Sequence, residues 1–417
     1  MSDISLGDRS LARSQRSLGP GKPRFELSPP LVAGCPLTST DRIQYPLEVD
    51  YDYEQALHLD FGGGTRMRMD HWAPLLPPLH PRANLEVGGT PLIDLSAIAP
   101  SQYRERGVFL KDESRNPTWS HKDRLNACTV SAALAVGAST IIVSSSGNHG
   151  VSAAAHAARA GLNCIVITMP DVSQAFRDMI LAYGAFPVYV PAEGRWPLMH
   201  ALTGIEGTHP VSNLTPVHTG HPWGAEGYKT IAYELYGQLG DVPAALVIPT
   251  GYGEMLFGIH KGFRELKQLG VTSRLPKIFA VEPAARGPLY HAMATGVEAV
   301  QVEARPTRQS GTACTVNSYR AVVALRESNG EPMLVSDEAA EKAQHTLARE
   351  GIWQELSPSA AFAALAELDG VVDDGPIVVI GCSTGLKEPA SPGLAREIMP
   401  DLASVRAYLR SEFHFEL

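Results

Sequence analysis

The sequence predicts an α/β protein with two lobes of twisted, parallel-type sheet and flanking helices, plus an irregular N-terminal extension. Strand patterns alternate with helical patterns roughly every twenty residues over 107–200 and again over 244–385. Glycine-containing turns follow several of these strands. Proline-rich sequence without regular pattern occupies residues 1 to about 85. Alternation of this kind produces βαβ units, whose strands pair in parallel.

The predicted elements follow one another in chain order. Strands are predicted over 107–114, 139–146, 163–170, 187–191, 244–250, 277–283 and 375–385. Helices are predicted from about 120 to 137 and over 147–161, 173–185, 255–270, 336–351 and 357–368, with Ser336 as an N-cap. The segment 193–227 lacks such a pattern, and we expect a loop that returns from a small inserted lobe.

The predicted domains follow from this order. Residues 1–84 form an N-terminal extension that packs on the large lobe, residues 85–125 and 226–417 form that large lobe, and residues 126–225 form the small one. The first thirty residues lack the apolar segment of a secretory signal, and a flexible leader is favoured over a transit peptide.

The composition excludes several classes of protein. The 417 residues include 19% charged and 44% hydrophobic residues, which are ordinary globular values. The net charge of -9 argues against a nucleic-acid or anionic-membrane partner. No apolar run approaches the roughly 18 residues of a membrane-spanning helix. The five cysteines are scattered, so we expect no disulfide framework, no metal site and a cytoplasmic location.

The segment 116–124, with the sequence NPTWSHKDR, contains the main candidate for chemistry. Asn116 and Pro117 predict a turn before a helix, with Lys122 in its first turn. The partial positive charge at a helix N-terminus disfavours an ammonium ion and increases the neutral amine, which is the nucleophile in Schiff-base formation. An isolated lysine in such a position is more often a solvated surface residue. The surrounding motifs favour the catalytic interpretation.

Three turns follow predicted strands at 144–150, 250–254 and 381–385. In open parallel sheets, ligands bind at the carboxyl ends of the strands. The turn Gly251-Tyr252-Gly253-Glu254-Met255 suits a phosphate cradle, because glycines let backbone amides approach an anion; helix–strand packing is the alternative. No GxGxxG or GxxxxGK[ST] motif supports a dinucleotide or nucleoside triphosphate site.

The other two turns offer neutral polar groups. The 144–150 turn has hydroxyls and the Asn148 amide at a helix start, which suits a carboxylate and a phenolic oxygen; a satisfied helix cap is the alternative. Cys382, Ser383 and Thr384 offer a neutral partner to a ring nitrogen, with a plain turn as the alternative. A phosphate cradle, a nucleophilic lysine and a neutral partner at one sheet edge indicate pyridoxal phosphate.

These motifs resemble those of a known family. The segment 116–124 resembles the NPTGSFKDR motif of threonine synthases and their relatives among the fold-type-II (tryptophan synthase β-like) pyridoxal-phosphate enzymes. Further resemblances are SSSGNHG at 144–150, VIPTGYGEMLFGIHKGFREL at 247–266 and GLKEP at 385–389. Weaker ones are EVGGTPL at 86–92, EGYKTIAYEL at 226–235 and REGIWQELSPSAAFAAL at 349–365. All of them occur in the family's order.

The resemblance implies roles for individual residues. Lys122 would bind pyridoxal 5'-phosphate as a Schiff base and move protons at the substrate's α and β carbons. The other cofactor-binding residues would be Asn148 for the phenolic oxygen, Gly251, Tyr252, Gly253, Glu254 and Met255 for the phosphate, and Cys382, Ser383 and Thr384 for the ring nitrogen. Substrate would be contacted by Thr118, Ser145, Ser146, Gly147 and His149.

Several positions depart from the family pattern. Glu254 replaces a cradle glycine, and we expect its side chain to point outward. Trp119 replaces a glycine, and His121 replaces a phenylalanine. Threonine synthases typically carry NPYR before EGxKT, with an arginine that helps bind the substrate phosphate, whereas this chain has NLTPVH at 213–218. We expect three nearby histidines to be ordinary loop residues, with a different anion site as the alternative: His209, His218 and His221.

The resemblance implies a carbon–oxygen lyase of amino-acid metabolism, acting on an amino acid with a β or γ leaving group. Threonine synthase-type conversion of O-phosphohomoserine to threonine is the first interpretation. The alternatives are a β-eliminating or β-replacing enzyme (serine/threonine dehydratase type, cysteate synthase type or a biosynthetic specialist) and a protein that binds the cofactor without turnover. We expect a homodimer.

Overall fold

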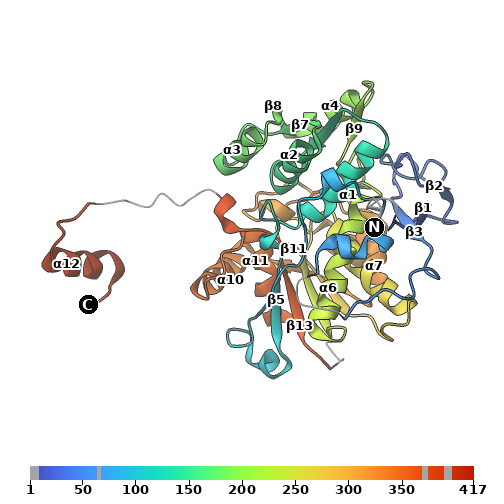
Figure 1. Ribbon diagram of the computed structural model, residues 1–417. Helices are drawn as coiled ribbons and strands as arrows, with labels where there is room; N and C mark the ends of the chain where they lie inside the picture. The colour runs from blue at the N-terminus through green and yellow to red at the C-terminus, as the bar shows by residue number, and fades with distance from the viewer. Residues whose placement is uncertain (1–8, 63–66, 369–373, 389–396) are drawn as a thin grey trace, which may run out of the picture.

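The computed structural model describes residues 9–62, 67–368, 374–388 and 397–417. In these ranges the chain forms a six-stranded sheet, a four-stranded sheet and a three-stranded N-terminal sheet, with helices packed around the two larger sheets (Figure 1). The start of the expected leader, residues 1–8, and Pro389 of the GLKEP motif lie outside the described residues.

The larger sheet has the strand order β12-β11-β10-β13-β5-β4. Its strands are β4 (Leu92–Asp94), β5 (Val108–Asp112), β10 (Ala245–Pro249), β11 (Lys277–Pro283), β12 (Glu331–Val335) and β13 (Ile377–Gly381). Neighbouring strands pair in parallel, except that β4 is antiparallel to β5 at one edge. Every residue of β10 and β13 is buried, as expected for central strands covered on both faces.

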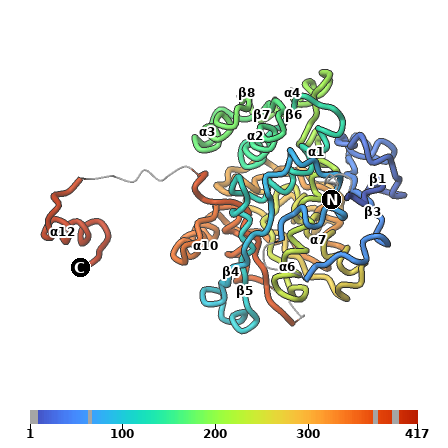
Figure 2. The backbone as a smooth tube through the Cα atoms, in the orientation of Figure 1, coloured from blue at the N-terminus to red at the C-terminus, as the bar shows by residue number. Residues whose placement is uncertain are grey.

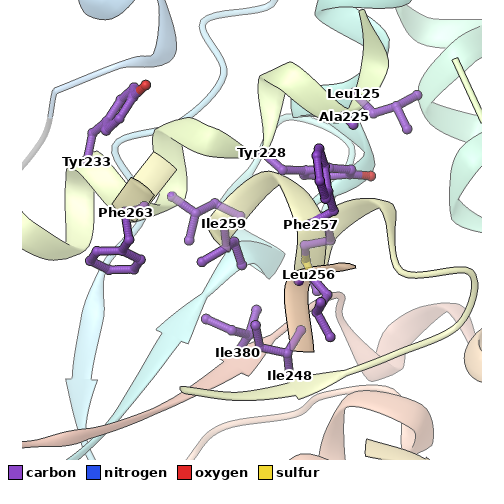
Figure 3. Close-up of a cluster of buried hydrophobic side chains, with 14 of the residues drawn as sticks. Leu125, Ala225, Tyr228, Tyr233, Ile248, Leu256, Phe257, Ile259, Phe263 and Ile380 are labelled. Carbon is purple, nitrogen blue, oxygen red and sulfur yellow. The ribbon is translucent and has the colours of Figure 1, made fainter. Parts of the chain in front are cut away.

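Alternate residues of these central strands enter two different cores. Ile248 and Ile380 pack on one face, where Leu256 lies directly above them (Figure 3). Val247 and Val379 pack on the other face. Helices of the first face are α6 (Lys229–Leu239), α7 (Glu254–Gln268) and α9 (Tyr319–Glu327), and those of the second are α10 (Asp337–Arg349) and α11 (Leu356–Ala363).

The smaller sheet has the strand order β8-β7-β6-β9, and all its strands are parallel. Its strands are β6 (Thr140–Ser144), β7 (Asn163–Thr168), β8 (Phe186–Tyr189) and β9 (Thr208–Pro210). Ile141 and Val143 pack with α1 (Lys122–Ala135), α2 (Asn148–Ala160) and α3 (Gln174–Ala182). Ile142, on the other face, packs with Met199 of α4 (Arg195–Leu202).

The N-terminal extension forms an antiparallel sheet of β1 (Ala12–Ser17), β2 (Arg24–Glu26) and β3 (Leu47–Tyr51). The expectation of a flexible leader is therefore wrong for the part that includes β1 and β2, because these strands pair with each other and with β3. Buried polar contacts attach it to the body of the protein. The Val49 amide donates to Glu226 Oε1 at 3.0 Å, and Lys261 Nζ donates both to that oxygen, at 2.7 Å, and to the Val49 carbonyl. Glu226 lies in the short helix α5 (Gly224–Gly227), so β3 is joined to both α5 and α7.

The expected loop over 193–227 is wrong in detail, because this segment contains α4, β9 and α5. Two of these elements, α4 and β9, contain a proline, which disfavours the prediction of a helix or strand. Pro197 lies in the first turn of α4, where its missing N–H removes no helical hydrogen bond. Pro210 ends β9 at the edge of the smaller sheet, where a proline is tolerated. The pattern also missed α6, α8 (Pro288–Thr295), α9 and β12.

The helix α12 (Leu402–Phe413) lies away from the rest of the molecule in Figures 1 and 2, and none of its residues is buried. Within the described ranges, no helix is long and apolar enough to cross a membrane.

Candidate active site

A cavity of about 290 Å³ lies at the carboxyl ends of strands from both larger sheets. Its lining includes residues at the ends of β6, β10 and β13 and the first residues of α1, α2 and α7. This is the edge at which parallel sheets bind ligands. The predicted residues that line it are Lys122, Ser145, Ser146, Gly147, Asn148, His149, Gly251, Tyr252, Gly253, Glu254, Met255, Cys382 and Ser383.

Two predicted residues, Thr118 and Thr384, are not part of this lining. The Thr118 hydroxyl donates to Asp123 at 2.6 Å and its amide donates to the same carboxylate, which braces the turn before α1. Thr384 accepts a hydrogen bond from the Leu386 amide at 3.4 Å and caps the short turn that follows it. The geometry therefore gives both residues local contacts that stabilise turns.

Lys122 is the first residue of α1 and lines the cavity. Its amide donates to Ser120 Oγ at 3.3 Å, and its Nζ lies 5.8 Å from the centre of the Tyr228 ring. In the described part of the chain, no carboxylate lies within ion-pair distance of this side chain. The amine is thus available to a ligand in the cavity.

Asn148 is held by two residues that the sequence did not single out. Its amide nitrogen donates to both oxygens of Glu355, at 2.9 and 3.1 Å, and its carbonyl accepts from Lys387 Nζ at 2.6 Å. Burial lowers the pKa of Lys387 to about 8 and raises the pKa of Glu355. Both residues lie inside quoted motifs, at 349–365 and 385–389, but the contact with Asn148 joins segments far apart in the sequence.

The glycine turn is shaped by close backbone approach. Gly253 has φ +82°, and a Cβ atom there would lie 2.5 Å from the Cβ of Ala321. A Cβ at Gly251 would lie 3.1 Å from Cys314 Sγ. Glu254 begins α7, so the amides of the first helical turn have no intrahelical acceptor and can donate to an anion.

The expectation that Glu254 points outward is wrong. Its side chain is buried and packs against Gly220, where any side chain would collide with the carboxylate. His218 Nε2 lies 4.0 Å from Glu254 Oε2. The missing side chain at Gly220 leaves the space that this acid occupies.

The third turn presents neutral groups. The Cys382 carbonyl accepts from the His121 amide at 2.9 Å and from His121 Nδ1 at 3.1 Å. Burial raises the pKa of the Cys382 thiol, so this group stays protonated, and burial lowers the pKa of His121 well below its usual value. The His121 ring lies 5.7 Å from that of Tyr228, an aromatic contact in the place of the family's phenylalanine.

The three histidines of the 209–221 segment are buried, unlike ordinary loop residues. Nε2 atoms of His209 and His221 lie 3.2 Å apart, and neither residue lines the cavity. His218 does line it, with its ring stacked on Tyr252 at a centroid distance of 3.9 Å. Segment 209–221 therefore contributes one histidine to the site.

The polar atoms of the cavity fit a cofactor with a phosphate, a carbonyl carbon and polar ring substituents. Lys122 offers a free amine, the glycine turn offers backbone amides, and Asn148 and Cys382 offer neutral polar groups. Three buried polar atoms of the lining have no hydrogen-bond partner in the described part of the protein: Ser144 Oγ, His149 Nε2 and His218 Nδ1. Because protein covers these three atoms even in the empty cavity, the fit to the cofactor depends on the Lys122 amine, the backbone amides of the glycine turn and the neutral side chains.

Comparison with known proteins assigns the family. Residues 83–383 match the family described as "Pyridoxal-phosphate dependent enzyme". The chain belongs to this family. Its fold is that of the fold-type-II pyridoxal-phosphate enzymes, and the family cofactor is the group that the cavity fits.

Relatives cover most of the chain. A threonine synthase of Methanosarcina acetivorans is 32% identical over 365 residues, which are 82% of this chain and 86% of the relative. A threonine synthase of Synechocystis sp. is 33% identical over 77% of this chain and 83% of its own length. Among solved structures, the T.th. threonine deaminase aligns with a TM-score of 0.61 and 25% identity over 73% of this chain and 94% of that structure. Maize serine racemase aligns with a TM-score of 0.60 and 18% identity, over 73% and 90%.

Proposed function

We propose that this family member is a threonine synthase-type lyase, which releases phosphate from O-phosphohomoserine and adds water at the β carbon to give threonine. The observation that carries the proposal is the set of relatives at 31–34% identity, named as threonine synthases, that span most of the chain. The cavity supports it, because a free lysine amine, a glycine turn and neutral polar partners meet there.

The bound pyridoxal phosphate supplies an electron sink that stabilises negative charge on the substrate's carbons. Lys122 would attach the cofactor and then carry protons at the α and β carbons. Asn148, oriented by Glu355 and Lys387, would hold the phenolic oxygen. The amides of the 251–255 turn would hold the phosphate.

The remaining roles concern the ring nitrogen and the substrate. Cys382 and Ser383 would face the ring nitrogen as neutral groups, which keeps the electron sink weak and suits elimination beyond the α carbon. The hydroxyls and amides of residues 145–149, at the start of α2, would hold the substrate carboxylate, which the partial positive charge of a helix N-terminus favours.

A second candidate is β-elimination or β-replacement on serine-like substrates. The observation that favours it is the lack of an arginine at 213–218, together with the structural likeness to a threonine deaminase. O-phosphohomoserine, O-phosphoserine, serine and threonine separate the two candidates when phosphate release and keto-acid formation are both measured.

The decisive experiment uses the purified protein supplied with pyridoxal phosphate. We expect a visible absorbance band from the Schiff base, loss of that band in Lys122→Met, and threonine formation from O-phosphohomoserine by the unaltered protein. If the purified protein binds no pyridoxal phosphate, the proposal is wrong. Uptake without turnover of any of the four substrates would support the non-catalytic alternative.

We also propose the division into an extension (1–84), a large cofactor-binding lobe (85–125 and 226–417) and a small lobe (126–225), a homodimeric assembly and a cytoplasmic location. The strand membership of the two larger sheets supports the division, because 92–112 and 245–381 supply one sheet and 140–210 the other. The molar mass in solution tests the dimer.

A further inference from the structure

One wall of the cavity comes from the segment 212–221, which lies between β9 and α5 and contains no helix or strand. Without the hydrogen bonds of a helix or sheet, its conformation depends on contacts with neighbouring segments. At its start, the Ser212 hydroxyl accepts from the Ser144 amide at 3.0 Å, at the end of β6. The residues of this wall that line the cavity are Ser212, Asn213 and His218.

The N-terminal extension contacts the 212–221 wall directly. The Val217 amide donates to Gln44 Oε1 at 3.0 Å, and the Thr219 hydroxyl donates to the Val32 carbonyl at 3.3 Å. The two backbones also approach closely, because a Cβ atom at Gly34 would lie 3.1 Å from Thr219 Cγ2. The extension therefore supplies the hydrogen-bond acceptors that a neighbouring strand would otherwise supply.

Arg320 of α9 joins the wall to the extension from a third element. The side chain is fully buried, and in the described ranges no carboxylate lies within ion-pair distance of it. Its Nε donates to the Thr219 carbonyl at 3.1 Å, and a terminal nitrogen donates to the Leu47 carbonyl of β3. Because a guanidinium presents its donors in a fixed plane, this one side chain holds two backbone segments in a set relation.

The anchored residue, Thr219, lies between two positions that shape the cavity. His218 has its ring stacked on Tyr252 at a centroid distance of 3.9 Å. Gly220 leaves the space that the Glu254 carboxylate occupies. A displacement of Thr219 would therefore move both the histidine ring and the packing surface of the acid.

We propose that the N-terminal extension positions the 212–221 wall of the cavity, with Gln44 and Arg320 as positioning residues. The extension fixes the wall, and the wall determines where Asn213 and His218 meet the substrate. The inference rests on the proposed function in taking this cavity as the substrate site. It gives the extension a role in substrate binding, in addition to its contacts with α5 and α7.

The test compares Gln44→Ala with Gln44→Glu and with Gln55→Ala. Gln44→Ala removes the acceptor of the Val217 amide, whereas Gln44→Glu keeps an oxygen there. Gln55 is an exposed glutamine of the same extension that bonds Asp52, also in the extension, and serves as the control. Two measurements are made on cofactor-loaded protein: deuterium exchange of the amides of 212–221 and of β10, and KM and kcat for O-phosphohomoserine.

We expect Gln44→Ala to speed exchange of the 212–221 amides about 2- to 10-fold and to raise KM by a similar factor, the loss of one neutral hydrogen bond. Exchange in β10 should not change, and kcat should stay within about 2-fold. Gln44→Glu and Gln55→Ala should match the unaltered protein. Arg320→Lys should speed exchange of the wall about 10- to 100-fold, because an ammonium lacks the planar fork that reaches both carbonyls.

If the 212–221 amides exchange no faster in Gln44→Ala, the inference is wrong. It is also wrong if β10 exchanges faster to the same extent, since Gln44 then supports the whole fold. Faster exchange of the wall with an unchanged KM would overturn it as well. Exchange needs no turnover, so it still decides whether the extension positions the wall if the unaltered protein does not act on O-phosphohomoserine and the proposed function fails.

Discussion

Two polar regions begin in the first turn of α1, at Lys122 and Arg124, and differ in how their charges are paired. Arg124 is fully buried and donates to Glu113 Oε2 and to Glu234 Oε1, each at 2.6 Å. Lys111 Nζ donates to the second oxygen of Glu234, also at 2.6 Å. Lys122, two positions before Arg124, has no carboxylate within ion-pair distance in the described part of the chain.

The polar groups around Arg124 stabilise the fold, whereas those of the cavity are available to a ligand. In the buried network two cations face two acids, and Thr90 Oγ1 bonds both acids at 2.6 and 3.2 Å, so the groups satisfy one another. In the cavity, the Lys122 amine has no acidic partner within the described residues. Buried charges persist in proteins when they are paired, whereas a charged group left unpaired at a cavity is available to a ligand.

The largest effect on activity is expected for Lys122, the unpaired cation of the cavity. Lys122→Met should lower kcat by at least about 10²- to 10⁴-fold, because under the proposed function the variant lacks both the attachment point of the cofactor and the proton carrier. Its melting temperature without cofactor should stay close to that of the unaltered protein, since Lys122 has no ion pair to lose. If the variant unfolds, Lys122 contributes to stability, as the buried network around Arg124 does.

In the buried network, a substitution should lower the stability of the protein. Arg124→Met should lower the free energy of unfolding by about 3–5 kcal/mol, because Glu113 and Glu234 lose their shared partner while remaining buried. Chemical denaturation with and without cofactor measures this loss. A stable Arg124→Met protein with low activity would show that the network serves catalysis.

The glycine turn offers a matched pair of substitutions. Gly253→Ala and Gly270→Ala both place a side chain at positive φ, but only the first meets Ala321, while nothing lies within 4 Å of the second. We expect Gly253→Ala to cost about 1–3 kcal/mol more than Gly270→Ala and to weaken cofactor binding. Equal unfolding free energies and equal cofactor affinities would show that the turn can move.

Lys387 should give a pH-dependent contribution to stability. Burial lowers its pKa to about 8 from the usual 10.5, so between these values the unfolded chain binds a proton that the folded protein lacks. Stability relative to Lys387→Gln should therefore rise with pH in this window, by at most about 1.4 kcal/mol per pH unit. Denaturation at several pH values checks the slope. If the stability difference between the protein and Lys387→Gln stays constant or falls with pH, the lowered pKa of Lys387 is contradicted.

The smallest effect is expected at Trp119, which has φ +58° and occupies the family's glycine position. Because the backbone already has a left-handed conformation, Trp119→Gly should change the unfolding free energy by less than about 1 kcal/mol. Trp119→Val should cost about 1–2 kcal/mol more, since a β-branched residue resists positive φ. Equal stability of the two variants would contradict this explanation.

Much of the fold could be predicted because its signals are local. The alternation of buried strands and helices over 107–191 is visible in the sequence, and parallel pairing follows from the length of the connections. The helix that begins at Lys122 and the Ser336 cap of α10 were predicted, and Ser336 Oγ accepts from the Ala339 amide at 3.2 Å. Elements with prolines, such as α4 and β9, were missed because propensity opposes them and packing overrides it.

The sequence by itself determined the chemistry of this protein. Lys122 in its motif, together with the glycine turn at a strand end, indicates the cofactor, because these signals depend on residues adjacent in the chain. The tertiary structure alone decided which groups surround them. Glu355 and Lys387 reach Asn148 from segments more than two hundred residues away, Glu254 turns inward toward Gly220, and Arg195 enters the cavity from α4. Such contacts depend on how separate elements pack, and no local pattern records that packing.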